Sequence, residues 1–183
     1  MSAIQPLRPA ASDEQAFESL FHAHYASLCS FVLSYVRAPD VAEEVVQTVF
    51  LRIWERRGTW PPAEEMRAYL FAACRNQAIG ILKHDRVVAH TAARVTRERL
   101  LIGTGDGPPS PDAELRASEI GVALRAAIQA LPERRRMVVV LRWEHQMSYT
   151  EIATVLAISP KTAEVQMSRA LASLRKQLAY LRE

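Results

Sequence analysis

Between residues 148 and 174, apolar side chains recur at the spacing of two short helices joined by a tight turn. Ala157 and Ile158 form the turn, after which Ser159 is a favourable N-cap and Pro160 a favourable first helical residue. Each helix has one apolar face that can be buried, and the two faces together comprise Ile152, Ala153, Leu156, Ala163, Met167, Ala170, Leu171 and Leu174.

The opposite face of the second helix is polar, which predicts a helix-turn-helix whose second helix can enter a DNA major groove. An ordinary helical hairpin in an all-α core is the alternative interpretation. The first turns of the second helix are expected to reach base edges through Lys161, Thr162, Glu164 and Val165. Three side chains are better placed for phosphates: Gln166, Ser168 and Arg169. Residues 134 to 136, all arginine, could add backbone contacts or form a solvated run.

Helical periodicity also runs through the rest of the chain, and strand signals are nearly absent. Asp13 and Asp40 are the expected N-caps of the first two helices. A further helical stretch toward Ile102 is left open. The pattern predicts an all-α protein with helices at residues 13 to 36, 40 to about 57, 63 to about 84, 112 to 130 and 132 to about 145.

Composition changes at residues 103 to 111, which hold three glycines and three prolines in nine positions. Such a run is typical of an interdomain linker, flexible in its glycine half and stiffer in its proline half. A surface loop inside one domain is the alternative. We therefore expect two small helical domains on a flexible linker: a disordered tail at 1–12, a first domain at 13–102, the linker at 103–118 and a second domain at 119–183.

Charge is unevenly distributed along this chain, whose net charge is only +3. Residues 120 to 183 hold ten basic against five acidic side chains, and residues 75 to 102 hold six against two. Residues 40 to 65 reverse the balance, with three basic against six acidic. The blocks suggest two nucleic-acid contacts and one acidic surface for another partner, although each block alone could be a solvated helix face.

Other residue patterns exclude several classes of function. The five histidines do not have metal-ligand spacing, and the chain has no glycine-rich phosphate loop or nucleophile elbow. We therefore expect no enzyme activity, no metal and no cofactor. No signal peptide is recognisable, and no window approaches the ~18 apolar residues of a membrane span. We expect a cytoplasmic protein without membrane insertion, in which Cys29 and Cys74 are buried free thiols.

The predicted second helix has two distinct faces. One face can fill a core through Val41, Val45, Val49, Phe50 and Ile53. The opposite stripe places a leucine among carboxylates and amides, and it comprises Asp40, Glu44, Gln47, Thr48, Leu51 and Glu55. A protein partner with a basic surface would fit this stripe, and a solvated face is the alternative.

The predicted third helix combines aromatic, amide and cationic side chains that can hold phosphate and stack on unpaired bases. Tyr69 and Phe71 are two residues apart, so we expect at least one of them in the core. Trp60, in the proline-rich loop before this helix, is either a stacking platform or a plug for the loop. The candidates for single-strand binding are Trp60, Tyr69, Arg75, Asn76, Lys83 and Arg86.

These segments, in this order, resemble a bacterial RNA polymerase sigma factor of the extracytoplasmic-function group. Two segments of this chain resemble the part of region 2 that binds the polymerase core, namely FESLFHAHYASLCSFVLSYV and DVAEEVVQTVFLRIW. The adjoining part, which melts and reads the −10 element, is resembled by RAYLFAACRNQAIGILKHDR. Region 4, which reads the −35 element, is resembled by LPERRRMVVVLRWEHQMSYTEIATVLAISPKTAEVQMSRALASLR. Compared with many relatives, this chain differs at Thr48, Gly80 and Glu164.

The resemblance implies a dissociable initiation subunit that needs no cofactor of its own. Its partners would be the polymerase core, through the clamp of the β′ subunit and the β flap, and promoter DNA. An anti-sigma factor is a further partner that the resemblance permits. The alternative is a two-domain helix-turn-helix regulator that does not join the polymerase, which would need neither the stripe around Leu51 nor the aromatic and cationic third helix.

Overall fold

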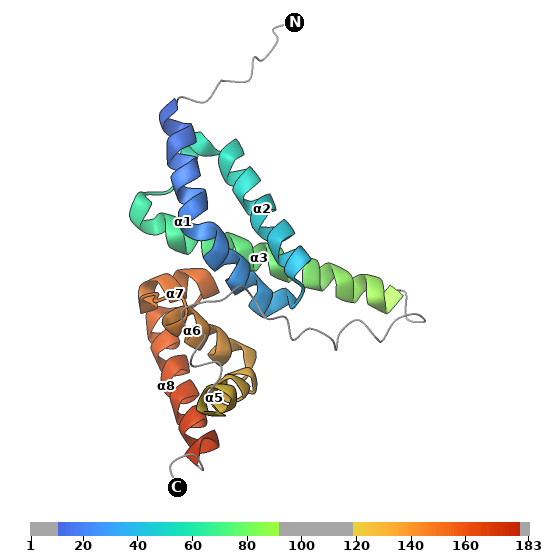
Figure 1. Ribbon diagram of the computed structural model, residues 1–183, viewed down its shortest axis with the longest axis vertical. Coiled ribbons are helices and arrows are strands. Elements are labelled where there is room, and N and C mark those ends of the chain that lie inside the picture. Colours follow the sequence, from blue (N-terminus) through green and yellow to red (C-terminus); the bar gives the residue numbers. More distant parts are fainter. Residues whose placement is uncertain (1–10, 92–118, 180–183) are drawn as a thin grey trace, which may run out of the picture. The chain divides into compact units, whose positions relative to one another are not determined.

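The computed structural model describes the backbone of residues 11–91 and 119–179 (Figure 1). Side chains are described at 13–84 and 121–179. Within these ranges the regular structure is helical, without strands, which confirms the all-α prediction. The chain divides into two compact units, Met1–Gly103 and Thr104–Glu183, which confirms two helical domains. Residues 1–10 of the predicted tail and the predicted linker at 103–118 lie outside the described residues.

In the described part of the first unit, three α-helices pack against one another (Figure 1). They are α1 (Ala11–Val36), α2 (Pro39–Glu55) and α3 (Ala63–Thr91), and a 3-10 turn, η1 (Arg57–Thr59), follows α2. The core is apolar and includes the edge-to-face and tilted ring pairs that Phe31 makes with Tyr35 and Phe71. Its buried side chains include Leu28, Phe31, Val32, Val45, Val46, Val49, Phe50, Ile53, Met66, Leu70, Phe71 and Cys74.

The expected N-caps of the first two helices are wrong. Helix α1 begins at Ala11, two residues before Asp13, and α2 has Ala38 as its N-cap residue with Pro39 in its first turn. Both aspartates lie inside a first turn, where a negative charge interacts favourably with the positive end of the helix dipole. A carboxylate in the first turn and an N-cap carboxylate give the same sequence signal, which explains the error.

Helix α3 is longer than the sequence suggested, because it continues unbroken past His84 to Thr91. The polar run around His84 and Arg86 looked like a helix end. However, residues 81 to 91 contain neither glycine nor proline, so nothing in them interrupts the helical hydrogen bonds.

Gly80 lies in the middle of α3, is exposed, and has open space where a Cβ atom would be. A glycine inside a helix costs about 0.5–1 kcal/mol relative to alanine, because it loses more backbone freedom on folding. We therefore expect Gly80→Ala to raise the free energy of unfolding of the first unit by roughly that amount. Urea titration followed by circular dichroism measures the change, and an unchanged or lowered midpoint would contradict the expectation.

The second unit contains α5 (Glu119–Gln129), α6 (Glu133–Trp143), α7 (Tyr149–Leu156) and α8 (Pro160–Gln177). Helix α8 packs against the three others (Figure 1). Helix α6 contributes a continuous buried segment from Met137 to Leu141, and α7 contributes Ile152, Ala153 and Val155. Leu156, expected on the buried face of α7, is only half-buried. From α8 the buried side chains are Ala163, Met167, Ala170 and Leu174, while Leu171 is half-buried.

Local signals fix both ends of the turn between α7 and α8. At the start of α7, Ser148 and Glu151 form a reciprocal capping box, in which the Ser148 Oγ accepts from the Glu151 N–H at 3.2 Å. Ala157 ends α7 in the left-handed conformation, with φ 53° and ψ 51°. Ser159 caps α8 and Pro160 occupies its first turn, as expected. The predicted helix-turn-helix is confirmed.

Candidate nucleic-acid interface

The outward face of α8 is exposed where the sequence predicted it. Ala163 and Met167 point into the core of the second unit, so the intervening positions face away from it. Gln166 is half-buried, and Val165 is one of the exposed large apolar side chains of the described residues. The exposed candidates on this face are Lys161, Thr162, Glu164, Val165, Ser168 and Arg169.

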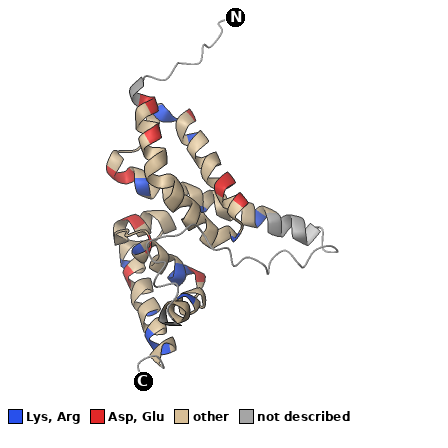
Figure 2. Cartoon of the chain, viewed as in Figure 1, with Lys and Arg blue, Asp and Glu red and all other residues tan. Residues whose placement is uncertain are grey.

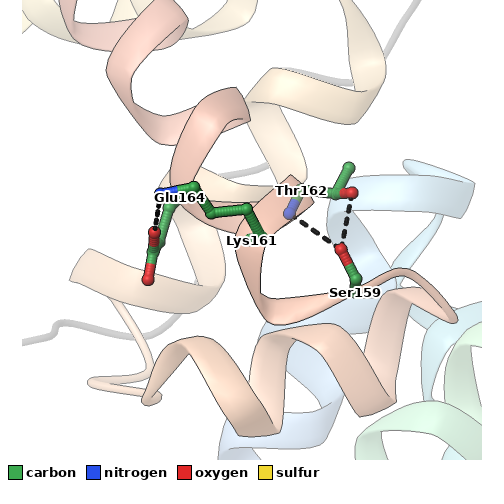
Figure 3. Close-up of polar contacts among 4 residues, drawn as sticks. All are labelled: Ser159, Lys161, Thr162 and Glu164. Atoms are coloured by element: carbon green, nitrogen blue, oxygen red, sulfur yellow. Dashed lines mark hydrogen bonds and ion pairs between the residues drawn. The ribbon is translucent and has the colours of Figure 1, made fainter.

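The first turn of α8 has an ordered arrangement of polar groups (Figure 3). The Ser159 Oγ accepts a hydrogen bond from the Thr162 N–H at 3.0 Å and lies 2.8 Å from the Thr162 Oγ1. The Lys161 Nζ donates to the Glu164 Oε2 at 3.0 Å. The hydroxyl of Thr162 is therefore occupied by the cap, while the charged candidates at positions 161 and 164 pair with each other.

The charges of α8 leave its N-terminal end available to an anion. Its first turn holds no acidic residue, whereas Arg175 and Lys176 lie in its last turn, where they interact favourably with the negative end of the helix dipole (Figure 2). In contrast, α2, α3, α6 and α7 each carry a carboxylate in the first turn. Within a helix-turn-helix, this absence suits an approach of α8 to DNA, because a carboxylate there would repel phosphate.

Two of the three arginines that begin α6 serve the fold. The Arg135 Nη1 donates to the Ser173 Oγ at 3.3 Å, and the Arg136 Nη1 donates to the Gln129 carbonyl oxygen at 3.1 Å. These bonds connect α6 to α8 and to the end of α5. Of the three arginines, Arg134 alone is exposed, so its side chain is the one that remains accessible to a DNA phosphate.

The outer stripe of α2 has the exposure expected of a binding surface. Leu51 is 64% exposed, the largest exposed fraction among the exposed large apolar side chains of the described residues. Asp40, Glu44, Gln47 and Glu55 are also exposed, and Thr48 is half-buried. On the inner side, Ala42 and Val46 are buried in addition to the predicted core positions, whereas Val41 is only half-buried.

Two side chains that the sequence did not single out support this stripe. Tyr25 of α1 interacts with the side chain of Gln47, and the Arg52 Nη1 donates to the Gln77 Oε1 of α3 at 2.8 Å. Both interactions join different helices, so no local pattern could have identified them. They hold the outer face of α2 against the rest of the first unit.

Helix α3 exposes an aromatic, an amide and a cation along one face. Tyr69, Asn76 and Lys83 are each seven residues apart, which is close to two helical turns, and all three are exposed. Phe71 is fully buried, which confirms that one of the two neighbouring aromatics belongs to the core. Arg75 is half-buried, and its Nη1 donates to the Asn76 Oδ1 at 3.3 Å. The side chain of Arg86 lies outside those that the structure describes.

Trp60 has a role within the fold. Its indole Nε1 donates to the carbonyl oxygen of Ile53, near the end of α2, at 2.9 Å, and its ring is half-buried. Of the two interpretations from the sequence, this bond favours the plug that closes the loop before α3. Because the ring is half-buried, stacking on a base would have to use the part of the indole that remains exposed to solvent.

The cysteines are free, and they differ in burial. Cys74 is fully buried, and this burial raises the pKa of its thiol to about 12. Cys29 is half-buried rather than buried, which corrects the expectation of two buried thiols, and burial raises its pKa as well. In the part of the chain that the structure describes, no group of three His, Cys, Asp or Glu side chains could hold a metal ion.

Among residues 11–91 and 119–179, no helix has an apolar stretch of the length that crosses a membrane.

Comparison with known families gives two matches, one in each unit. Residues 20–87 match the family described as Sigma-70 region 2, and residues 121–174 match the family described as Sigma-70, region 4. The first range spans α1 from Leu20 onward, α2 and most of α3. The second spans α5 to α8, including the exposed face of α8.

Individual relatives are similar over nearly their whole length. The RNA polymerase sigma factor CarQ of Myxococcus xanthus is 30% identical over 97% of this chain and 97% of its own. The ECF RNA polymerase sigma factor SigX of Bacillus subtilis is 25% identical over 93% of this chain and 87% of its own.

Solved structures show the same fold. The sigma factor RpoE from Bartonella quintana, solved with the anti-sigma factor NepR, has a TM-score of 0.70 at 19% identity and covers 90% of this chain and 98% of its own. CnrH, solved with the cytosolic domain of CnrY, has a TM-score of 0.60 at 24% identity and covers 91% of this chain and 90% of its own.

Proposed function

Because this chain belongs to the extracytoplasmic-function group of bacterial RNA polymerase sigma factors, we propose a role for each of its three exposed helix faces. The outer stripe of α2 binds the clamp of the polymerase β′ subunit. The exposed face of α3 binds the −10 element as a single strand, and α8 reads the −35 element in the major groove. The second unit also contacts the β flap. The alternative of a regulator that does not join the polymerase is not favoured by this family.

One observation carries the proposal: both regions of the family are present, in family order, and each has its expected face exposed. A helix-turn-helix regulator would account for α8 alone. It would not account for Leu51, a large apolar side chain that is 64% exposed among carboxylates and amides. In this proposal the polymerase covers that side chain and removes its apolar surface from water, which is favourable.

For the −35 element, α8 offers two kinds of contact. Lys161, Thr162, Glu164 and Val165 lie in its first turns, where a recognition helix meets base edges. Gln166, Ser168 and Arg169, together with the backbone N–H groups at the helix start, are assigned to phosphates. The Thr162 hydroxyl already bonds to the Ser159 Oγ, so a base contact through this residue uses its methyl group or the remaining hydrogen-bonding capacity of the hydroxyl.

For the −10 element, the face of α3 supplies stacking, hydrogen bonding and charge. Tyr69 can stack on an extruded base, Asn76 can bond to its edge, and Lys83 can hold the backbone. Arg75, whose guanidinium bonds to Asn76, positions that amide in this proposal. Trp60 and Arg86 complete the predicted set.

The remaining partners and the setting follow from the family. The relative from Bartonella quintana was solved with an anti-sigma factor, and we include such a protein among the partners of this chain. The protein works in the cytoplasm, where it meets the polymerase. We assign it no catalytic step and no cofactor, since the family consists of DNA-recognition subunits.

A transcription assay tests the proposal directly. The purified chain is mixed with polymerase core and with a template library whose −35 and −10 segments are randomised. We expect specific run-off products only when both proteins are present, with a shared −35 and −10 sequence among the templates used. Products that do not depend on the chain, or a chain that fails to copurify with core, would contradict the proposal.

Arg169 provides a test of the phosphate contacts. It is exposed on α8 beyond the residues assigned to bases, so Arg169→Ala is expected to weaken binding to all −35 sequences alike. The slope of log affinity against log salt concentration should become shallower by about 1, because one phosphate contact is lost. Arg175→Ala, which removes an exposed arginine from the last turn of the same helix, is the matched control. A changed sequence preference in Arg169→Ala would move this residue to the base-reading group.

A further inference from the structure

We propose that Lys161 and Glu164 read a single G·C base pair of the −35 element together, as a preformed donor and acceptor pair. The proposal rests on the proposed function of α8 and assigns that helix a specific base-pair chemistry. The sequence predicted Lys161 and Glu164 as two separate candidates for contacts with base edges. The structure instead joins the Glu164 carboxylate to the Lys161 ammonium at 3.0 Å (Figure 3).

The spacing of this ion pair matches the major-groove edge of a base pair. In a G·C pair the guanine O6 accepts a hydrogen bond from the cytosine N4, so these two atoms lie about 2.9 Å apart. The O6 also faces the groove as an acceptor, and the second N4 hydrogen faces it as a donor. The Lys161 Nζ and the Glu164 Oε2 are complementary in charge and are separated by 3.0 Å. The ammonium can therefore donate to O6 while the carboxylate accepts from N4.

An A·T pair offers a poorer match to the same two groups. Guanine presents two neighbouring acceptors, N7 and O6, and an ammonium can donate to both of them. In an A·T pair the thymine O4 would be a single acceptor for Lys161, and the thymine methyl group lies beside it. The additional acceptor and the absence of the methyl group favour G·C.

The order of the two charges shows that the pair is poorly arranged for helix stability. Lys161 lies in the first turn of α8, near the positive end of the helix dipole. A glutamate that precedes a lysine stabilises a helix better than the reverse order found here. Both side chains are also open to solvent, at 82% for Lys161 and 45% for Glu164, so the ion pair adds little to folding. The same exposure leaves both groups accessible to DNA.

A promoter selection with reconstituted holoenzyme tests the proposal, using templates randomised in the −35 element. The proteins compared are the wild type, Lys161→Ala, Glu164→Ala and the double variant, with Lys176→Ala as a control from the last turn of α8. We expect the wild type to prefer G·C at one position about tenfold or more, which is within the range for a good base contact. Both single variants should lose preference at that same position, and the double variant should lose no more than either.

The possible outcomes separate this proposal from the function on which it rests. Single variants that alter different base pairs, or that leave every G·C preference unchanged, contradict the joint reading while the −35 role of α8 stands. A shared position that prefers A·T also overturns the assignment. A wild-type holoenzyme that selects no −35 sequence contradicts both proposals. Circular dichroism of each variant confirms that the exposed substitutions leave the helices intact.

Discussion

Replacing Leu51 with arginine is expected to abolish assembly with the polymerase core while leaving the helical content of the first unit unchanged. Leu51 is 64% exposed on α2, so its replacement removes no packing from the core of the unit. Burying a leucine at an interface contributes about 1.5–3 kcal/mol, which corresponds to roughly 10- to 100-fold in affinity. An arginine would lose this contribution. Its charged guanidinium would also have to be removed from water into an apolar contact, which costs free energy.

Affinity for core, measured with labelled protein, tests this expectation. Leu51→Ala should give an intermediate loss, because it removes the contact without introducing a charge. Ala63→Arg adds the same cation at an exposed position at the start of α3, outside the two segments that resemble the core-binding part, and is the matched control, with core binding expected to remain close to wild type. If Leu51→Arg assembles holoenzyme with unchanged affinity, the stripe of α2 is not the binding surface.

The second large effect is expected in promoter opening. Tyr69→Ala and Asn76→Ala each remove a group from the exposed face of α3 without disturbing the buried side, where Phe71 and Cys74 lie. Stacking on an aromatic contributes ~1–3 kcal/mol per base, so loss of Tyr69 should reduce the open-complex population by roughly 5- to 150-fold. The loss should concern the melted strand, so binding of the closed duplex should change less.

A pre-melted template provides the internal control. A bubble template needs no energy to separate its strands, so any defect of a variant on the bubble reports lost contact with the unpaired strand. On duplex DNA the same variant should show this defect together with lost melting. Permanganate footprinting of unpaired thymines measures the open fraction on duplex DNA, and the affinity of holoenzyme is measured on the bubble template. Variants that open the duplex as well as the wild type does would contradict the assignment of α3 to the −10 strand.

Trp60 needs a more conservative substitution than either residue on α3. Its indole N–H bonds to the Ile53 carbonyl, so Trp60→Ala would remove both a loop anchor and an aromatic surface. Trp60→Phe keeps an aromatic ring, although a smaller one than the indole, and removes the N–H group that makes the bond. Normal promoter opening by Trp60→Phe, together with a lower midpoint of unfolding, would indicate that the hydrogen bond serves the fold.

The sequence predicted best what depends on neighbouring residues. The turn at Ala157, the Ser159 cap and the outward face of α8 each follow from side chains within a few positions of one another, and all are present in the structure. The length of α3 was underestimated because the polar run around His84 was taken for the helix end, although it contains no helix breaker and the helix continues to Thr91. The two aspartates expected as caps lie in the first turn instead, since both positions favour a carboxylate.

Contacts between distant parts of the chain could not be predicted from the sequence. The bond from Trp60 to Ile53 decides between two interpretations of that residue, and it depends on how the loop folds back on α2. Likewise, Arg135 looked like a candidate for DNA, but its guanidinium donates to Ser173, 38 residues away. For the site residues, the sequence was sufficient to predict which helix faces are exposed. The hydrogen bonds that these residues make with other parts of the chain could be identified only from the three-dimensional structure.

The capped turn between α7 and α8 also has a thermodynamic consequence for promoter binding. The capping box of Ser148 and Glu151, the left-handed Ala157 and the cap at Ser159 together restrict the backbone of the motif before any DNA is present. A segment that orders only on binding loses conformational entropy, which subtracts from its affinity. Here that loss has already occurred during folding. The free energy of contact with the −35 element can therefore appear largely as affinity.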